Sequence, residues 1–494
     1  MLVTGAAFVV NYMITLVLTP FITQTVGTAA YGFVSLAKNL AQYATIITLA
    51  LNSFASRHIA VAYHNGEMEK ANTYFSSTFF GDVLLGGGVL VGACVAIVYL
   101  DRLFVIPPEI LSDVQWLFLI VFVNFLLVTI FTVYGAGAYI ANRLDIVGLF
   151  KLISYVVEAV LLLVIYRLLE ARVAYVGFGL MAASGVVIAS NVWITRRFTP
   201  QLRVRRTSFR RQAVKKLVAD GVWSSANDLG ALLHNGLDLA ICNLMLTPLA
   251  MGQLAIAKSI DLIFHSLYHL VAQTFQPIFL RSYAENKIDK LMRELKLSMK
   301  LSGMMANLAF AGFAALGMAY YRLWIPGEDI ALVYRLTVIT VLTSVASGSM
   351  KPLYYIYTLT VKQKIPCMVT IVTGVMNVLG MVVLLRFTDM GIDAVVWTTA
   401  VLVGFINVVS NPVYMAHVLH QPLRTFYPNI LRNVLSCAVL TGLFMGLSRL
   451  YMPASWPTLI LCVILYAGIG MLVHFAVVFT PEEWREVLRP FRKK

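Results

Sequence analysis

The sequence predicts an all-α protein that crosses a membrane about fourteen times. Of its 494 residues, 60% are hydrophobic and only 12% are charged, and the mean hydropathy is +0.81. A soluble protein needs far more polar surface than this composition supplies, whereas surface in contact with lipid needs almost none. Apolar runs of about 20 residues or more, long enough to span a bilayer as a helix, recur along nearly the whole chain.

Charged residues and Pro/Gly clusters divide these runs into fourteen predicted helices. The first six cover residues 2–26, 31–61, 73–100, 113–140, 146–169 and 172–195. The next six cover 218–246, 249–280, 297–321, 330–358, 365–386 and 390–416, and the last two cover 428–449 and 456–479. The first run has neither a charged N-terminal region nor a small-residue cleavage site, so we expect a retained helix rather than a signal peptide.

A basic segment, Arg196–Lys216, marks the internal boundary. We expect an N-lobe at residues 1–195, a basic cytoplasmic linker at 196–217 and a C-lobe at 218–416. Residues 417–494 then hold the last two helices and a basic tail. The second and eighth helices are separated by six crossings and therefore run in the same direction. This predicts two parallel six-helix repeats, with a site at their interface.

An internal repeat supports the two lobes. Ala30-Tyr-Gly-Phe-Val-Ser-Leu-Ala-Lys38 matches Ala250-Met-Gly-Gln-Leu-Ala-Ile-Ala-Lys258 at an offset of 220 residues, and the same offset carries Tyr63 onto Tyr283. A charge inside a membrane helix costs at least ~2.5–3.5 kcal/mol on insertion scales. Two such charges at equivalent positions predict one anion-binding site between the lobes, as in a transporter of an anionic substrate.

The distribution of basic residues predicts the orientation. Arg196–Lys216 holds nine Lys and Arg, Arg281–Lys300 holds six and the tail Arg485–Lys494 holds five, whereas the alternate connections hold about one each. Positive charge accumulates on the cytoplasmic side of membrane proteins. We therefore expect both termini in the cytoplasm. The same rule accounts for the net charge of +15 without a nucleic-acid partner.

Polar residues inside the predicted helices are candidates for the binding site. Lys38, Gln42 and Asn52 fall close to one face of the second helix. A lysine is a point charge suited to phosphate, so two lysines with amides and hydroxyls suit a pyrophosphate that carries a sugar. The lipid tail of such a substrate stays in the bilayer. Snorkelling of Lys38 towards the membrane surface is the structural alternative.

Other charged groups have two open interpretations. Lys258, Asp261 and His265 share one face of the eighth helix, where Lys258 and Asp261 either neutralise each other or serve a substrate and an ion. Histidines at 265 and 269 are either a proton relay or packing residues. The remaining candidate acids, Glu158, Asp228 and Asp238, either bind a coupling proton or sodium ion or hold helices together. Asp82 is a further acid, inside the third predicted helix, and Asp220 is another in the seventh.

Several classes of function are excluded or disfavoured. The five cysteines lie in or beside apolar runs without CxxC spacing, so we expect no disulfide framework and no metal site. No phosphate-binding glycine loop is followed by Lys-Ser/Thr, no catalytic motif emerges, and we expect neither an enzyme nor a cofactor. The segments Tyr63–Lys70 and Tyr283–Lys290, with Leu291, Leu295 and Met299 at helical spacing, predict interfacial helices or a docking site for a soluble partner.

The opening segment carries a family resemblance. Asn11, Leu18-Thr-Pro20, Val26-Gly27, Tyr31-Gly32 and Ser56-Arg57 resemble Wzx-type polysaccharide flippases of the multidrug/oligosaccharidyl-lipid/polysaccharide exporter superfamily. The resemblance implies ion-driven flipping of an undecaprenyl-pyrophosphate-linked oligosaccharide across a bacterial cytoplasmic membrane, by alternating access.

The resemblance also implies roles for individual residues. Lys38 and Lys258 fit the basic residues of the family's cavity, Arg57 lies near the inner mouth, and Asp238 with Asn377 frames a cation. The first helix carries no acid or base, which argues against a lipid II substrate and an ion site in the N-lobe. Two rival functions remain: a cation-coupled multidrug antiporter, and a membrane scaffold for a polysaccharide synthesis complex that docks other assembly proteins.

Overall fold

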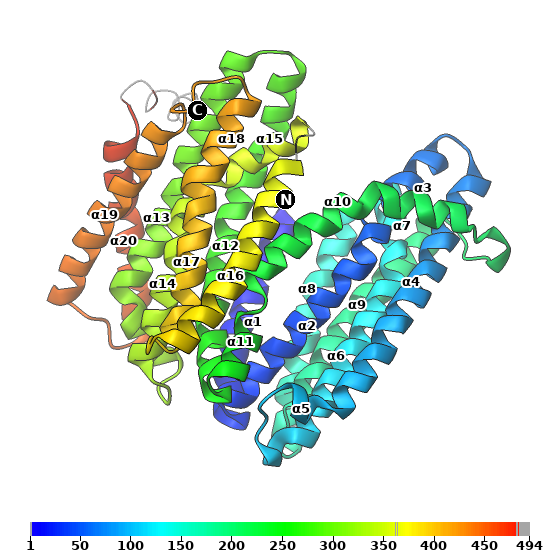
Figure 1. Ribbon diagram of the computed structural model, residues 1–494, viewed down its shortest axis with the longest axis horizontal. Helices are drawn as coiled ribbons and strands as arrows, with labels where there is room; N and C mark the ends of the chain where they lie inside the picture. Colours follow the sequence, from blue (N-terminus) through cyan, green and yellow to red (C-terminus); the bar gives the residue numbers. More distant parts are fainter. Residues whose placement is uncertain (1, 361, 363, 481–482, 484–494) are drawn as a thin grey trace. The chain divides into compact units, whose positions relative to one another are not determined.

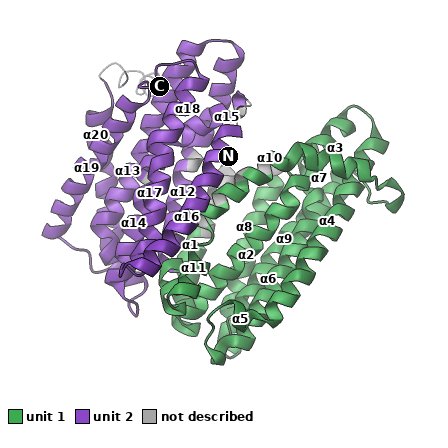
Figure 2. Cartoon of the chain, viewed as in Figure 1, with its two compact units in different colours: residues 1–255 green, residues 256–494 purple. Residues whose placement is uncertain are grey.

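The protein is described by a computed structural model, which covers residues 2–360, 362, 364–480 and 483. The chain divides into two compact units, unit 1 at Met1–Ala255 and unit 2 at Ile256–Lys494 (Figure 2). The side chains of Asn11, Asn227 and His269 and the predicted basic tail Arg485–Lys494 lie outside the described part.

Unit 1 is a bundle of helices (Figure 1). Its helices are α1 (Leu2–Val26), α2 (Thr28–Asn52), α3 (Ala55–His64), α4 (Met68–Val98), α5 (Leu100–Leu103), α6 (Leu111–Phe131), α7 (Gly135–Ile140), α8 (Leu144–Leu168), α9 (Ala174–Phe198), α10 (Arg211–Asn235) and α11 (Asp238–Met245). The unit runs past the predicted linker because α10 and α11 pack along α2. The predicted lobe boundary at 196–217 stays a prediction.

Unit 2 begins within the long helix α12 (Pro248–Ala284) and continues to the end of the chain. It contains α13 (Ile288–Trp324), α14 (Ile330–Met350), α15 (Tyr354–Leu359), α16 (Lys364–Phe387), α17 (Ile392–Phe405), α18 (Asn411–Val418), α19 (Tyr427–Leu450) and α20 (Trp456–Val478). Helix α13 is the centre of this unit, since α14, α19 and α20 all pack against it.

The all-helical membrane class is confirmed, but the count of fourteen stays a prediction. Within the described residues, eleven helical segments are long and apolar enough to cross a membrane. Helices α2 and α10 are not among them, because Lys38, Asn39 and Gln42 interrupt α2, and Lys215, Lys216, Asp220 and Asp228 interrupt α10. Both of these helices carry predicted site residues.

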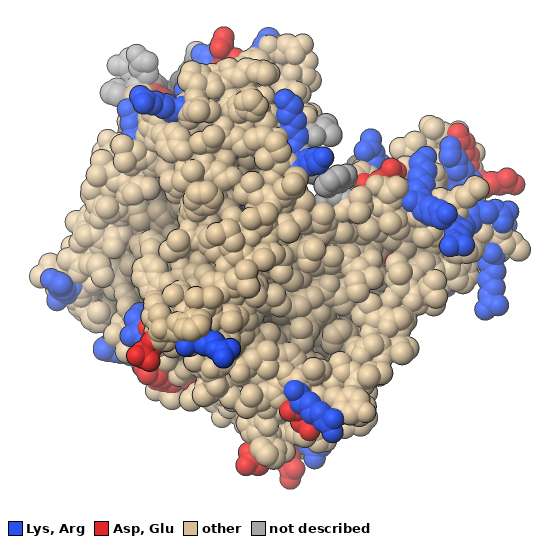
Figure 3. All heavy atoms as spheres, in the orientation of Figure 1, with Lys and Arg blue, Asp and Glu red and all other residues tan. Residues whose placement is uncertain are grey.

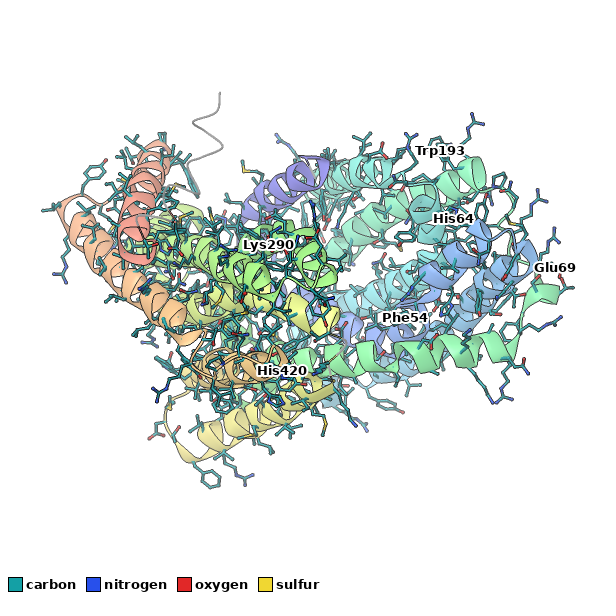
Figure 4. The ribbon with its side chains drawn as sticks, turned by 90° about the horizontal axis from the view of Figure 1, so that it is seen from above. Phe54, His64, Glu69, Trp193, Lys290 and His420 are labelled. Atoms are coloured by element: carbon teal, nitrogen blue, oxygen red, sulfur yellow. The ribbon has the colours of Figure 1, made fainter. Side chains whose placement is uncertain are left out.

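Several predicted helices are interrupted rather than straight. The run 31–61 breaks after Asn52, where Phe54 (labelled in Figure 4) precedes α3. The run 330–358 tightens into a 3₁₀ turn at Lys351–Leu353, and 390–416 widens into a π-helix at Ile406–Ser410. Pro352 and Pro412 lie at or beside these last two irregularities, because proline has no backbone N–H and clashes with the preceding helical turn.

The repeat of 220 residues reappears in the local backbone structure. After α3, Gly66 N–H bonds the Tyr63 carbonyl and Glu67 N–H bonds the Ala62 carbonyl. After α12, the equivalent residues Asn286 and Lys287 bond Tyr283 and Ser282. Gly66 and Asn286 both have positive φ, 78° and 54°, which these two residue types tolerate best. The two copies therefore end their helices with one and the same turn.

The predicted interfacial helices are wrong. Residues 65–67 and 285–287 form tight turns, and α13 runs without interruption from Ile288. Leu291, Leu295 and Met299 are fully buried in a core shared with Met350, Ile356 and Phe426. Their helical spacing reflects burial against protein rather than contact with the surface of a leaflet.

The surface is divided by polarity as expected for a membrane protein. On the face drawn in Figure 3, Lys and Arg gather over the end of unit 1 that holds α3 and the start of α10. The helical bodies between the two charged ends present mainly uncharged atoms. In α20, for example, Ile460, Ile464 and Leu472 are each more than half exposed, which suits contact with lipid.

Candidate functional site

Lys38, the basic side chain predicted to bind substrate in unit 1, is accessible. Lys38 lies mid-way along α2 and is exposed, and so is Gln42 one turn later on the same face. Among the described residues, Lys38 forms no ion pair with an acid. Its ammonium group is therefore available to an anion from outside the chain, as a substrate-binding role requires.

Two other predicted substrate residues have different surroundings. Asn52 is only partly exposed, and its amide nitrogen donates to Asp82 Oδ1 at 2.7 Å and to the Thr48 carbonyl at 3.2 Å. Arg57 is exposed on α3, beyond the break in the helix. The structure therefore binds Asn52 to a neighbouring helix and leaves Arg57 open, at the same end as the basic segment 196–216.

Helix α2 is held very closely along its length. A Cβ atom on Gly221 of α10 would lie 2.0 Å from the Ala50 carbonyl oxygen, and one on Gly236 would lie 2.6 Å from the Tyr43 ring. At the other end, a Cβ on Gly32 would lie 2.9 Å from Gly252. Because glycine has no side chain, a backbone or a ring from α2 can come close at these three places, where any other residue would collide.

We call the contact between α2 and α10 the seam. At one end of it, a histidine and an aspartate side chain also contact each other. His58 of α3 and Asp220 of α10 lie 2.8 Å apart, with side-chain exposures of 24% and 41%. The His58 ring also lies against Tyr74 of α4. Residues from three helices, α3, α4 and α10, thus meet at this point.

The predicted ion-coupling acids of unit 1 lie in different environments. Asp238 is 4% exposed at the first residue of α11, where the free N–H groups of a helix favour negative charge, and it is near enough to interact with Tyr43. Glu158 is half-buried on α8 near Tyr155. Asp228 is exposed on α10. Their ion-coupling role stays a prediction, and Asp238 is the most protected of the three.

Unit 2 contains a charged cluster on α12 and α14. Lys258 and Asp261 are half-buried on α12, and His265 lies 3.7 Å from Asp261 one turn later. Lys351, from the 3₁₀ turn after α14, lies close enough to Asp261 for their charges to interact. Its ammonium group sits 5.6 Å from the centre of the Tyr354 ring. The structure therefore places a second lysine, Lys351, beside Asp261.

Lys351 is the residue that the sequence reasoning missed. The signal was present, because a lysine followed by proline interrupts an otherwise apolar run of membrane-spanning length. Lys351 lies outside the repeated segments around Lys38 and Lys258 that predict the anion site. Lys351 lies close to Asp261 only because the end of α14 packs near α12, which is far from it in the sequence.

A chain of polar side chains continues from this cluster. Tyr354 donates its hydroxyl to Asn407 Oδ1 at 2.7 Å, and the Asn411 amide donates to the Tyr354 oxygen at 2.8 Å. Tyr357 donates to Asn411 Oδ1 at 3.0 Å. Asn407 lies inside the π-helical turn, a feature often found at functional sites. Hydroxyl and amide groups thus lie next to Lys351.

Asn377, the remaining predicted ion-coupling residue, is fully buried on α16. Its side chain pairs with the Thr399 hydroxyl of α17, with N···O and O···O distances of 3.2 and 3.3 Å. No group of three or more His, Cys, Asp or Glu residues suited to a metal ion occurs in the described part of the chain.

Comparisons with known proteins identify relatives over most of the chain. The family model described as "Polysaccharide biosynthesis protein" matches residues 1–283. An uncharacterized membrane protein, EpsK, from Bacillus subtilis is 29% identical over 489 residues, which cover 99% of this chain and 96% of EpsK.

Solved structures share the fold. The lipid II flippase MurJ, in an inward closed conformation, has a TM-score of 0.69 at 13% identity and covers 96% of this chain and 99% of its own. An inward-facing multidrug resistance transporter of the MATE family has a TM-score of 0.65 at 15% identity, over 83% of this chain and 98% of its own. At these identities the likeness concerns the fold alone.

Proposed function

Because the chain belongs to the polysaccharide biosynthesis protein family, we propose that it flips an undecaprenyl-pyrophosphate-linked oligosaccharide across a bacterial cytoplasmic membrane. The family and the fold are those of membrane transporters and flippases, which are not enzymes. Beyond the family, the proposal specifies the class of substrate and the membrane that it crosses.

A single observation supports the anionic substrate. Each unit carries a lysine in an apolar helix, Lys38 and Lys258, at equivalent places of a repeat whose turns also match in structure. Charge inside a membrane is costly and usually functional. An ammonium group suits phosphate as a point charge, and two of them suit a pyrophosphate.

The rest of the substrate meets different groups. Gln42 on the face of Lys38, and the hydroxyl and amide chain from Tyr354 to Asn411 near Lys351, offer donors and acceptors to sugar hydroxyls. The polyprenyl tail stays in lipid, because exposed aliphatic side chains keep the outside of the helices apolar. Alternating access then carries only the polar headgroup across the membrane.

The direction and the energy source belong to the same proposal. The basic segment 196–216 faces the cytoplasm by the positive-inside rule, which puts both termini there and exposes Arg57 to the incoming headgroup. A proton or sodium gradient drives the cycle through acids such as Asp238 and Asp261. The polar loops are also available to other polysaccharide assembly proteins.

Surface-glycan export tests the proposal. Cells that lack the gene are complemented with the wild type, with Lys38→Ala and Lys258→Ala together, or with Lys151→Ala, a matched loss of charge from an exposed lysine of α8. We expect the double variant to restore roughly a tenth of the glycan or less at equal membrane abundance, because each lost charged contact weakens binding about tenfold. Lys151→Ala is expected to restore it fully.

Other outcomes separate the rival functions. Full export by the double variant would show that the lysines are structural and would remove the anion site from the proposal. An unchanged glycan after deletion, accompanied by greater sensitivity to cationic drugs, would establish the multidrug antiporter instead. A scaffold would tolerate both substitutions and would lose glycan only when the whole protein is absent.

A further inference from the structure

Asp82 is a carboxyl group in the middle of a membrane-spanning helix without a described cation beside it. It lies half-way along α4 and is completely buried. Its Oδ1 accepts the amide hydrogen of Asn52 at 2.7 Å, whereas its Oδ2 is buried and has no hydrogen-bond partner in the described structure. An ionised carboxylate in hydrocarbon requires compensation, so this pair is incomplete as it stands.

Two further oxygen atoms beside Asp82 are also unsatisfied. Thr78, one helical turn earlier on the same face of α4, is completely buried and its hydroxyl lacks a partner among the described residues. Asn52 Oδ1 is in the same condition. Most buried side-chain oxygens in proteins are hydrogen-bonded. Here three oxygens without a described partner lie close together, because Thr78 is one helical turn from Asp82 and Asn52 is hydrogen-bonded to it. This grouping indicates a missing ligand.

The charged and titratable groups around this half of α4 have other roles. The residues concerned are His58, Tyr74, Tyr134, Arg210 and Asp220. His58 is bound to Asp220 and lies against Tyr74, and Tyr134 lies against Phe75. Arg210 is exposed, and its hydrogen bonds to α4 come from its backbone: its N–H donates to Ser77 Oγ and its carbonyl accepts from the Ser77 hydroxyl. No ion pair with Asp82 occurs in the described part of the chain.

We propose that Asp82, Asn52 and Thr78 form a binding site for a monovalent cation, either a proton or Na⁺, at the junction of α2 and α3. A proton would bind Oδ2 and leave a neutral acid, whose O–H then donates to an oxygen of Asn52 or Thr78. A sodium ion would instead take oxygen atoms of all three residues as ligands, the donor type that hard cations prefer.

The position of the site links it to the seam between α2 and α10. Asn52 is the last residue of α2. The hydroxyl oxygen of the next residue, Ser53, lies 2.6 Å from the position that a Cβ atom on Gly221 of α10 would take. A cation that changes the hydrogen bond between Asn52 and Asp82 therefore acts on the residues at which α2 ends and meets α10. The coupling of this site to transport rests on the proposed function, whereas cation binding does not.

Purified wild-type protein in nanodiscs, without any glycan, tests the site. Infrared spectra recorded across a pH titration report a protonated buried carboxyl by its C=O stretch, and unfolding midpoints in NaCl against choline chloride report sodium binding. We expect one of these two signals in the wild type and its loss in Asp82→Asn. The control Asp101→Asn removes an exposed acid of unit 1 and should retain the signal.

The outcomes distinguish the two cations and the two proposals. A carboxyl band that Asp82→Asn abolishes identifies a proton site, and a sodium response that it abolishes identifies a sodium site. Absence of both from the wild type, or their persistence in Asp82→Asn, overturns the proposal. Should Asp82→Asn fail to fold, Thr78→Val decides: we expect roughly tenfold weaker sodium binding or a shifted band, and no change overturns the site. Glycan export, measured separately, decides the proposed function.

Discussion

The ammonium group of Lys300 lies 2.6 Å from both carboxylate oxygens of Glu483. Lys300 belongs to α13 and is 2% exposed, and Glu483 lies just beyond the end of α20. The Phe479 ring is 5.5 Å from the same ammonium group, and His474 of α20 contacts the Lys300 backbone carbonyl. One buried lysine thus connects the segment just after α20 to the central helix of unit 2.

We expect Glu483→Gln to lower the free energy of unfolding by about 3 kcal/mol, because it leaves a buried ammonium group without its counter-charge. Unfolding in mixed micelles with rising SDS measures the loss. Asp145→Asn, which breaks the exposed pair with Arg143, is the matched control and should change stability by less than about 1 kcal/mol. An equal effect of the two substitutions would contradict this account.

The same pair predicts how stability depends on pH. Partial burial alone would raise the pKa of Glu483, but the hydrogen bonds from Lys300 and Thr480 and the charge of Lys300 outweigh it and hold the pKa below 4.5. A lowered pKa stabilises the folded state fully above the unfolded value and loses its contribution as pH falls through the folded value. The stability gap between wild type and Glu483→Gln should therefore be constant near neutrality and close below about pH 4.5. A gap that widens on acidification would refute the assignment.

Gly221→Ala should disrupt the seam between α2 and α10. Its new Cβ would lie 2.0 Å from the Ala50 carbonyl oxygen, a distance that forces the helices apart. We expect a loss of roughly 2 kcal/mol or more in the same unfolding assay, as for other overpacked sites. Gly185→Ala on α9 meets nothing within 4 Å and should be neutral or slightly stabilising. Similar results for both glycines would show that the seam is looser than described.

The bridge between His58 and Asp220 should contribute modestly to stability. A double-mutant cycle with His58→Ala and Asp220→Ala isolates the interaction between the two side chains from their other contacts. We expect a coupling energy of about 0.5–1 kcal/mol, because both side chains are partly exposed. A coupling energy of zero would mean that their 2.8 Å contact has no energetic weight.

Lys351 should contribute to glycan export. We expect Lys351→Met to reduce export about tenfold at equal abundance, since it removes a charge close to Asp261, whereas Lys351→Arg should retain more of the activity. Lys364→Met, a change of an exposed lysine at the start of α16, serves as the control. Wild-type export by Lys351→Met would confine this lysine to a structural role.

The sequence predicted the helices better than their interruptions. Long apolar runs require helices in a membrane, so most predicted limits fall near the observed ends. The 3₁₀ turn at Lys351 and the π-helical turn at Ile406–Ser410 depend on how one proline disturbs its neighbours, which hydropathy does not register.

Only part of the candidate site was predictable from the sequence, because the sequence does not show which helices pack together. Lys38 and Lys258 were identifiable because a repeat made them visible within the sequence. Asp82 was noted as an isolated acid, but its partner Asn52 is 30 residues away on another helix. Helical periodicity places residues on a face of their own helix and does not say which helix that face meets.

The glycine contacts of α2 also bear on how this chain tolerates mutation. At Gly221, Gly236 and Gly252 the smallest possible addition, one methyl group, would already overlap a neighbouring atom. A saturation library read out by membrane abundance should therefore show these codons as near-invariant, while adjacent lipid-facing codons accept many aliphatic residues. To give this protein a new headgroup specificity, the exposed positions Lys38 and Gln42 of α2 can be changed. The glycines of α10 and α12 that contact α2 leave almost no room for substitution.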